Sequence, residues 1–375
     1  MRSCRIPFSL FIATAVLVGC DTRPPLEPSR VPAAPNMAKG GPNTGSQFAT
    51  AAKLAPIKGG GHGEAYAVDR TGSIVAGYSW DRGGRMHPVT WRLQNGTWTI
   101  TVLPYAPTAT SAIARAVNDE GDVAGNDWPA SSPHAVLWPS TGGFDGLGCY
   151  DLGQAYGISA AGRVLVGARH GVSPASAAVW RPGSCREDLP PLVMGGWARA
   201  MAINGDATII GGDATIIGGT AGVPVRWRRV AGVWEIQQLD TRPGSVYGAN
   251  AAGDLVGHVR IPCATPSEEI PAPQCSRGVI WYADGGSREL GTLGGETTSP
   301  RAINAAGEVV GLSTLVPNGN GYPFFWSEAL GMRQLPATGS GMAFGVSGVR
   351  PDGTRLVVGA GGQPFSALAW VVRNP

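Results

Sequence analysis

The chain repeats one pattern of small, bulky and polar positions seven times after residue 60. Each copy opens with a bulky residue between small ones, continues to a turn that contains Gly, and then enters an apolar run. One Trp follows in each copy, and the spacing between successive copies is 42 to 54 residues: Trp91, Trp138, Trp180, Trp227, Trp281, Trp326 and Trp370. A period of this length indicates a circular or stacked array of one supersecondary unit.

Each copy contains four short segments with strand character. In the copy from Pro300 to Pro336, apolar runs near residues 301–303, 308–311, 322–326 and 332–335 predict four strands. Asn304-Ala305-Ala306-Gly307 predicts the first turn, since an Asn side chain can accept a backbone hydrogen bond and Gly adopts the conformation that closes it. The sequence therefore predicts an all-β, seven-bladed β-propeller of four-stranded antiparallel blades, with copies opening near residues 65, 114, 155, 198, 246, 300 and 343.

The seventh copy lacks a fourth strand, because the chain ends five residues after Trp370. A matching segment occurs at the other end, where residues 51–56 have the form of residues 333–336. An unpaired strand at a sheet edge is a site for aggregation. We therefore expect the N-terminal segment to complete the seventh blade and close the ring.

The first 46 residues have a different character from the repeats. Residues 1–19 predict a lipoprotein signal peptide, with a basic start, an apolar stretch and Leu17-Val18-Gly19-Cys20 at the cleavage point. Cys20 is the expected lipid-attachment residue, and the Pro-rich residues 20–46 predict an extended tether. The propeller occupies residues 47–375. This organisation predicts a lipid-anchored protein at the cell envelope, outside the cytoplasm.

The charge pattern makes a nucleic-acid partner unexpected. The chain has 29 basic and 26 acidic residues, and its three lysines, Lys39, Lys53 and Lys58, all precede the first repeat. No stripe of basic residues is present that would neutralise phosphates. The sequence also contains no motif for a cofactor or for an established catalytic mechanism, and its five histidines are not at metal-ligand spacing, so we expect neither a cofactor nor a metal.

Four cysteines lie within the repeats. Cys263 and Cys275 sit in one Pro-rich insertion around Ile261–Pro273, and a disulfide between them is expected in an exported protein. Cys149 and Cys185 occupy comparable places in adjacent copies. A second disulfide between them is expected only if the fold brings their Cα atoms within about 7 Å. A zinc site is the alternative for these residues, although the Cys-x-x-Cys spacing typical of such sites is missing.

Residues His134-Ala135-Val136-Leu137-Trp138 carry a resemblance to a known repeat. With Ala114–Asn118 before them and Asp151-Leu152-Gly153 after them, they resemble the bacterial HAF extracellular repeat, named for a His-Ala-Phe triplet at this place. The resemblance extends over nearly all of the chain after residue 47. It implies an extracellular repeat protein and assigns no chemistry, and this chain departs from the triplet because Val136 stands in place of Phe.

One heptapeptide occurs twice in succession, as residues 205–211 and 212–218. Seven extra residues within one strand would invert its two faces. We therefore expect the second copy to form an added hairpin across Gly211-Gly212, as a duplication without a function.

The residues at the second position of each repeat copy, counted from its first small residue, form the candidate binding site. Aromatic residues and Arg alternate there: Tyr66, Arg115, Tyr156, Arg199, Tyr247 and Arg301, followed by Phe344. In one interpretation these side chains only fill the space between blades. In the other they line the central channel and bind an anionic or carbohydrate ligand.

The sequence thus favours a non-enzymatic module that binds a glycan, a peptide or a protein. One alternative is an extracytoplasmic enzyme acting on glycans, either a hydrolase or a lyase, for which two carboxylates at the channel mouth would be the sign. The other alternative is a purely structural component of the envelope.

Overall fold

The computed structural model describes residues 48–129, 132–147, 152–160, 162–171, 173–216, 221–264, 274–362 and 364–373, all within one compact unit. The predicted signal peptide, the tether and the lipid-attachment residue Cys20 lie outside the described residues. Among those described, no helix has the length and hydropathy that crossing a membrane requires.

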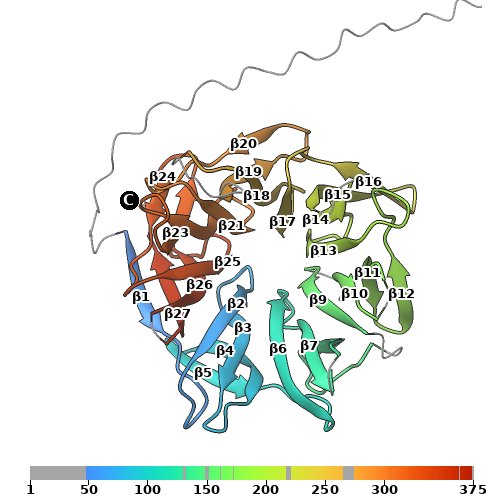
Figure 1. Ribbon diagram of the computed structural model, residues 1–375. Helices are drawn as coiled ribbons and strands as arrows, with labels where there is room; N and C mark the ends of the chain where they lie inside the picture. Colours follow the sequence, from blue (N-terminus) through green and yellow to red (C-terminus); the bar gives the residue numbers. More distant parts are fainter. Residues whose placement is uncertain are drawn as a thin grey trace, which may run out of the picture. The chain divides into compact units, whose positions relative to one another are not determined.

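Seven antiparallel sheets stand around a central axis, as Figure 1 shows. The first four blades are, from the axis outward: β2 (Gly63–Val68), β3 (Ile74–Trp80), β4 (Met86–Gln94) and β5 (Thr97–Val102); β6 (Ala109–Val117), β7 (Val123–Pro129) and β8 (His134–Trp138); β9 (Gly153–Ile158), β10 (Leu165–Arg169), β11 (Ser176–Arg181) and β12 (Ser184–Asp188); β13 (Ala198–Ile203), β14 (Ile209–Thr215), β15 (Gly222–Val230) and β16 (Val233–Gln238). The remaining three are: β17 (Gly244–Ala249), β18 (Leu255–Pro262), β19 (Gln274–Trp281) and β20 (Ser287–Glu289); β21 (Thr298–Ile303), β22 (Val309–Thr314), β23 (Gly321–Ser327) and β24 (Gly331–Gln334); β25 (Gly341–Val346), β26 (Arg355–Gly361), β27 (Ser366–Val372) and β1 (Ala49–Lys53). The predicted all-β, seven-bladed propeller is confirmed.

The second blade differs from the other six. It has three named strands, and its outer position is marked by two isolated bridges, Leu137 with Asp145 and His134 with Leu152. Residues 148–151, which include Cys149, are outside the described part of the chain.

Ring closure occurs as the sequence predicts. Strand β1 pairs antiparallel with β27 from Ala49 opposite Val372 to Lys53 opposite Leu368. The N–H of Leu54 donates to the carbonyl of Ala367 at 2.9 Å, and the Leu54 side chain is buried. The two ends of the propeller are therefore hydrogen-bonded to each other within one blade.

The seven repeated tryptophans lie in the contacts between blades. All are at most 4 % exposed. Trp91 packs with Val358 and Ala369 of the preceding blade, and Trp227 packs with Val179 of the blade before it. Burying each ring in this way contributes about 2–3 kcal/mol of hydrophobic stabilisation.

The first turn of every blade uses the side-chain chemistry that the sequence predicts. The turn residues are buried, and in each the side-chain oxygen accepts a backbone N–H from the turn or from the start of the next strand. They are Asp69, Asn118, Ser159, Asn204, Asn250, Asn304 and Ser347. These bonds satisfy donors that would otherwise be buried without a partner.

The duplicated heptapeptide does not form the added hairpin, so that prediction was wrong. Strand β14 runs straight through Gly211-Gly212 and pairs with β13 on one side and β15 on the other. The chain has already reversed at the turn that begins at Asn204, and so the second copy continues the strand. Gly212 suits this position, since a Cβ there would lie 1.9 Å from the carbonyl oxygen of Arg199. The last two residues of the second copy are not described.

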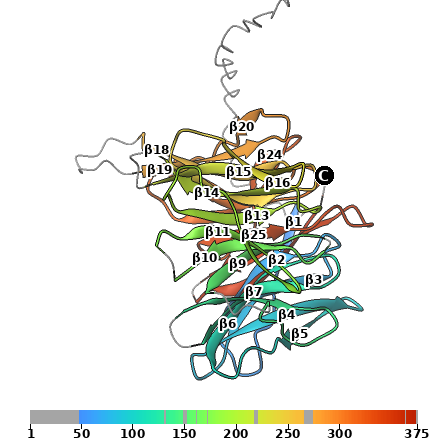
Figure 2. The same cartoon turned by 90° about the vertical axis from the view of Figure 1, so that its right-hand side faces the viewer.

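The predicted disulfide between Cys263 and Cys275 is present, with Cα atoms 4.9 Å apart. It continues the hairpin of β18 and β19, whose last paired residues are Pro262 and Gln274. Figure 2, a side view of the ring, shows these two strands reaching out at one face of it. The pairing of Cys149 with Cys185 falls outside the described residues, because Cys149 and the Cys185 side chain are not among them.

Candidate binding site in the central channel

The innermost strand of every blade contains a β-bulge, a residue that the neighbouring strand leaves unpaired. These bulged residues form a row around the axis that we call the channel belt: Tyr66, Arg115, Tyr156, Met201, Tyr247, Arg301 and Phe344. All seven are partly buried.

The belt differs from the predicted ring in the fourth blade. The bulge there lies between Ala200 and Ala202, which makes Met201, and not Arg199, the equivalent of the other six residues. The opening of this copy is Ala200-Met201-Ala202 followed by Ile203 and Asn204, two residues later than the sequence pattern suggested. The predicted alternation of aromatic residues and Arg is therefore interrupted by one thioether.

Neighbouring blades touch through the side chains of the belt. The rings of Phe344 and Tyr66 are 5.1 Å apart between centroids, and the guanidinium carbon of Arg115 lies 5.6 Å from the ring centroids of both Tyr66 and Tyr156. Arg301 lies 4.1 Å from the centroid of Tyr247. These residues thus form two contiguous segments of cation–π and aromatic contacts, as expected for desolvated guanidinium groups over ring faces.

A second row of residues lies two positions earlier in each innermost strand. It is closer to the top face, by which we mean the face where the innermost strands begin. Its members are Glu64, Ile113, Gln154, Arg199, Ser245, Ser299 and Met342. We call this set the upper row, and it is where the structure places the fourth predicted ring residue, Arg199.

The three predicted arginines have different partners. Arg199 donates two hydrogen bonds to the buried Asp213, at 3.1 and 2.6 Å, and this bidentate ion pair raises the pKa of Arg199. Arg115 donates to the neutral Asn126 at 3.0 Å. Arg301 has no hydrogen bond or ion pair with another described residue, although its Nε is buried. Two of the three cations in the channel therefore lack a carboxylate among the described residues.

A pocket of about 270 Å³ opens beside the channel between the fourth and fifth blades. It lies near the top face, since it is bounded by the beginnings of β13, β15 and β17 and by the later halves of β14 and β18. The polar and aromatic residues that line it are Trp197, Arg199, Asp213, Ser245, Tyr247, His258 and Arg260. Tyr247 belongs to the channel belt, so the pocket adjoins the belt directly.

Hydrogen bonds across the two blades hold the inner wall of this pocket. The Ser245 hydroxyl donates to the same Asp213 carboxylate that Arg199 binds, at 2.7 Å. Asp213 and Ser245 are both more than nine-tenths buried. The position of this carboxylate is therefore set by two side chains, Arg199 of its own blade and Ser245 of the next, which is the kind of support that a preorganised site needs.

His258 forms the opposite part of the wall. Its ring stacks on Tyr247 with centroids 5.5 Å apart, and its Nδ1 is buried without a hydrogen-bond partner. Burial, followed by the charges of Arg301 and Arg260, lowers the pKa of His258 to about 4. The imidazole is therefore neutral at pH 7, and it can accept a hydrogen bond from a ligand.

Tyrosines on the other side of the channel remain protonated donors. Burial raises the pKa of Tyr66, and the nearby charge of Glu64 raises it further. Burial and Glu64 also raise the pKa of Tyr78 to about 12. The hydroxyl groups near Glu64 are therefore neutral across the physiological pH range.

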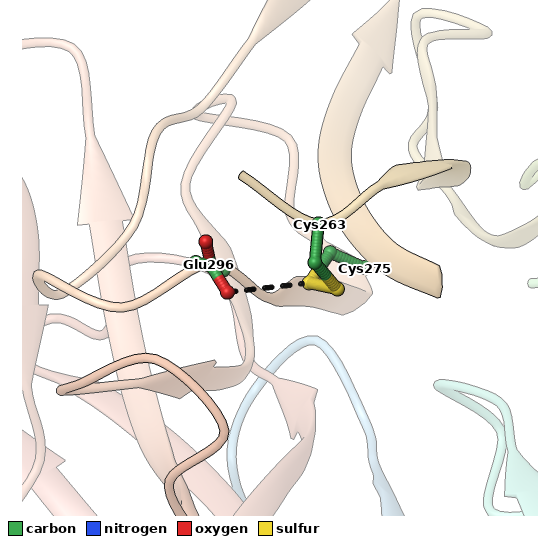
Figure 3. A group of neighbouring side chains, drawn as sticks. All are labelled: Cys263, Cys275 and Glu296. Atoms are coloured by element: carbon green, nitrogen blue, oxygen red, sulfur yellow. Dashed lines mark hydrogen bonds between the residues drawn. A yellow bond between two sulfur atoms is a disulfide. The ribbon is translucent and has the colours of Figure 1, made fainter. Parts of the chain in front are cut away.

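The disulfide and Glu296 form a separate cluster, drawn in Figure 3. Sγ of Cys275 lies 3.7 Å from Oε2 of the buried Glu296, and the three ligand-type atoms are within 4.8 Å of one another. Both sulfur atoms are bonded to each other, so neither is a thiolate that could bind zinc. The zinc alternative is not supported by this arrangement.

The fold has relatives among solved structures at low sequence identity. The β-propeller domain of the Trilobed protease from Pyrococcus furiosus is 10% identical, with a TM-score of 0.52 over 83% of this chain and 94% of that domain. The β-propeller domain of Cps50 (Swd1) from Myceliophteria thermophila is 12% identical, with a TM-score of 0.51 over 87% of this chain and all of that domain. The chain is a β-propeller. No family model matches the sequence, and no curated protein does.

These likenesses establish the architecture, and a shared architecture does not by itself define an activity. The site therefore has to be interpreted from its own side chains. Sequence periodicity located five of the seven residues of the belt as candidates and included Phe344 in the pattern. It did not identify Met201, Asp213, Ser245, His258 or Arg260, because their proximity depends on which strands lie side by side.

Proposed function

We propose that this protein is a lipid-anchored propeller of the cell envelope, of the HAF repeat type, that binds a ligand through its central channel and the adjoining pocket. In this proposal it is a non-enzymatic binding module for a glycan, a peptide or a protein. The lipid anchor and the location rest on the Leu17–Cys20 sequence and on the tether that follows it.

The unbalanced charge of the channel carries this proposal. Arg115 and Arg301 lie in the belt without a carboxylate partner among the described residues, while Arg199 is already neutralised by Asp213. A guanidinium group that is partly desolvated gains most from an anionic or strongly accepting ligand group. Purely space-filling arginines would be expected to have their polar tips satisfied within the protein.

Within the pocket, the acidic side chains favour binding over glycan hydrolysis. Asp213 is the one acidic side chain among the described residues that line the pocket, and it is held in an ion pair. Retaining and inverting glycosidases use two carboxyl groups that face each other across the scissile bond. Asp213 by itself does not provide this arrangement.

The experiment is a binding screen of the purified full-length protein in detergent against glycan and peptide arrays, followed by titration of the ligands found. The variant Arg115→Ala with Arg301→Ala should weaken binding at least about tenfold, because each removes a charge-assisted hydrogen bond. The control is Arg229→Ala with Arg333→Ala, two exposed arginines on the outer strands β15 and β24. Equal affinity of the channel variant and the wild type would refute the proposal for the channel.

A further inference from the structure

The second copy of the duplicated heptapeptide supplies the central residue of the pocket. In the first copy Asp206 lies in a turn, where its carboxylate accepts hydrogen bonds from Thr208. The corresponding residue of the second copy is Asp213, which lies in β14 opposite Arg199. One sequence therefore occupies two environments, and only the second copy contributes to a pocket.

The matching positions in other blades show what is particular about this place. Where Arg199 faces Asp213 and Ser245 faces His258, four polar side chains meet at one junction between blades. At the equivalent positions, the junctions of the first blade with the second, the third with the fourth and the fifth with the sixth have three polar side chains each, and that of the sixth with the seventh has one. The junction of the fourth and fifth blades is thus built for a polar ligand.

The pocket combines cations at its rim with hydrogen-bond acceptors on its inner wall. Arg260 is exposed at the rim and has no side-chain partner among the described residues, and the guanidinium of Arg301 lies on the adjoining Tyr247. These cations favour an anion. The inner wall instead has acceptors: the Asp213 carboxylate, which still has acceptor capacity beside its hydrogen bonds from Arg199 and Ser245, and the neutral imidazole of His258. These groups favour hydroxyl donors.

A ligand that satisfies both must carry one anionic group and several hydroxyl groups on a compact frame. A cavity of about 270 Å³ accommodates one sugar ring. Its lining has only Ala221 and Pro243 as aliphatic side chains, which is poor for an apolar side chain of a peptide. The composition of the wall therefore favours an acidic saccharide over a peptide C-terminus.

We infer that this pocket binds a single hexuronate unit of an acidic glycan, with the carboxylate on Arg260 and the ring hydroxyls on Asp213, His258 and Ser245. This inference rests on the proposed binding function and assigns a ligand class to it. It also gives the duplicated heptapeptide a role, since Asp213 comes from the second copy.

The test is calorimetric titration of the full-length protein with D-glucuronate, D-glucose, inorganic phosphate and a short peptide with a free C-terminus. Glucuronate should bind at least about tenfold more tightly than glucose or phosphate, since only glucuronate satisfies both Arg260 and the acceptors. The variant Arg260→Gln should reduce this preference about tenfold. Arg228→Gln, which changes an exposed arginine on β15, is the matched control and should bind like the wild type.

Three results would overturn the inference. These are no detectable binding of glucuronate, equal affinity for glucuronate and phosphate, or an unchanged preference in Arg260→Gln. Competition by the peptide alone would assign the pocket to a peptide carboxylate. One outcome is that the wild type binds no glucuronate while the double substitution of Arg115 and Arg301 still abolishes binding of an array ligand. In that case only the pocket assignment is wrong. If glucuronate binds and the channel variant has no effect, the pocket stands and the channel proposal fails.

Discussion

Single residues in this channel acquire their properties from neighbouring blades. Asp213 is fixed by Arg199 on the adjacent strand and by Ser245 from the next blade. His258 faces Arg260, Arg301 and Tyr247, and two cations together with burial keep its imidazole neutral. Such perturbed titratable groups in a cleft are typical of binding or catalytic sites.

The lowered pKa of His258 predicts a pH dependence of stability. The unfolded histidine takes up a proton near pH 6.5, whereas the folded one does so only near pH 4. Between these values the unfolded state binds more protons, so the free energy of unfolding should fall as the pH is lowered from 6.5 to 4, by about 2–3 kcal/mol. Urea denaturation at pH 7.0 and 4.5 measures this change.

The variant His258→Gln should lose most of that pH dependence. Burial and Arg199 also lower the pKa of His170, and so a smaller slope of the same sign should remain. An unchanged slope in the variant would show that His258 is not neutral for the reason given.

At the scale of elements, the hairpin of β18 and β19 contains the insertion that makes the fifth copy the longest of the repeat, with 54 residues between Trp227 and Trp281. It carries Arg260 and His258 on β18, and the disulfide between Cys263 and Cys275 lies immediately beyond its last paired residues. The two cysteines are separated by 12 positions in the sequence. The disulfide therefore limits the freedom of the Pro-rich insertion where it leaves the sheet.

Replacing both cysteines, as Cys263→Ser with Cys275→Ser, should lower the free energy of unfolding by about 2–4 kcal/mol, because closing a loop of this length restricts the unfolded chain. Guanidinium denaturation of the oxidised wild type and of the double variant tests this. Wild-type protein treated with dithiothreitol is the control and should match the variant. Identical midpoints for all three samples would show that the disulfide does not constrain the unfolded state.

For the whole molecule, closure of the ring through β1 is the decisive feature. Trp91 donates from its indole to the carbonyl of Ala55 at 2.7 Å, as Trp227 does to Pro190 at 2.8 Å and Trp370 to Pro336 at 2.6 Å. The segment after β1 therefore joins the seventh blade to the first in the way that ordinary links join other blades. Closure leaves β27 paired on both sides.

Two truncations test closure. Removal of residues 1–54 takes away β1 and the buried Leu54, and should lower the Tm by about 5–10 °C and promote association through the exposed edge of β27. Removal of residues 1–47 keeps β1 and is the control, which should retain the Tm of the wild type. Calorimetry and size-exclusion chromatography report the two effects. Closure by β1 would be contradicted if the variant lacking residues 1–54 had the same Tm as the variant lacking residues 1–47 and remained monomeric.

The amino-acid sequence alone determined the number of blades, the buried tryptophans, the turn chemistry and the closing strand. These features depend on local preferences and on a period repeated seven times, so errors in one copy are corrected by the other six. It also predicted the disulfide, because the two cysteines sit in one insertion.

Only the tertiary structure decided which residues form the candidate site. Whether Arg199 or Met201 occupies the belt depends on where the β-bulge lies in β13. The sequence pattern placed the start of this copy two residues too early, and so it did not show the position of the bulge. Whether the second heptapeptide forms a hairpin or continues a strand depends on pairing with both neighbours, β13 and β15. The meeting of Asp213 with Ser245 and His258 joins different blades, and such long-range contacts leave no periodic signal in the chain.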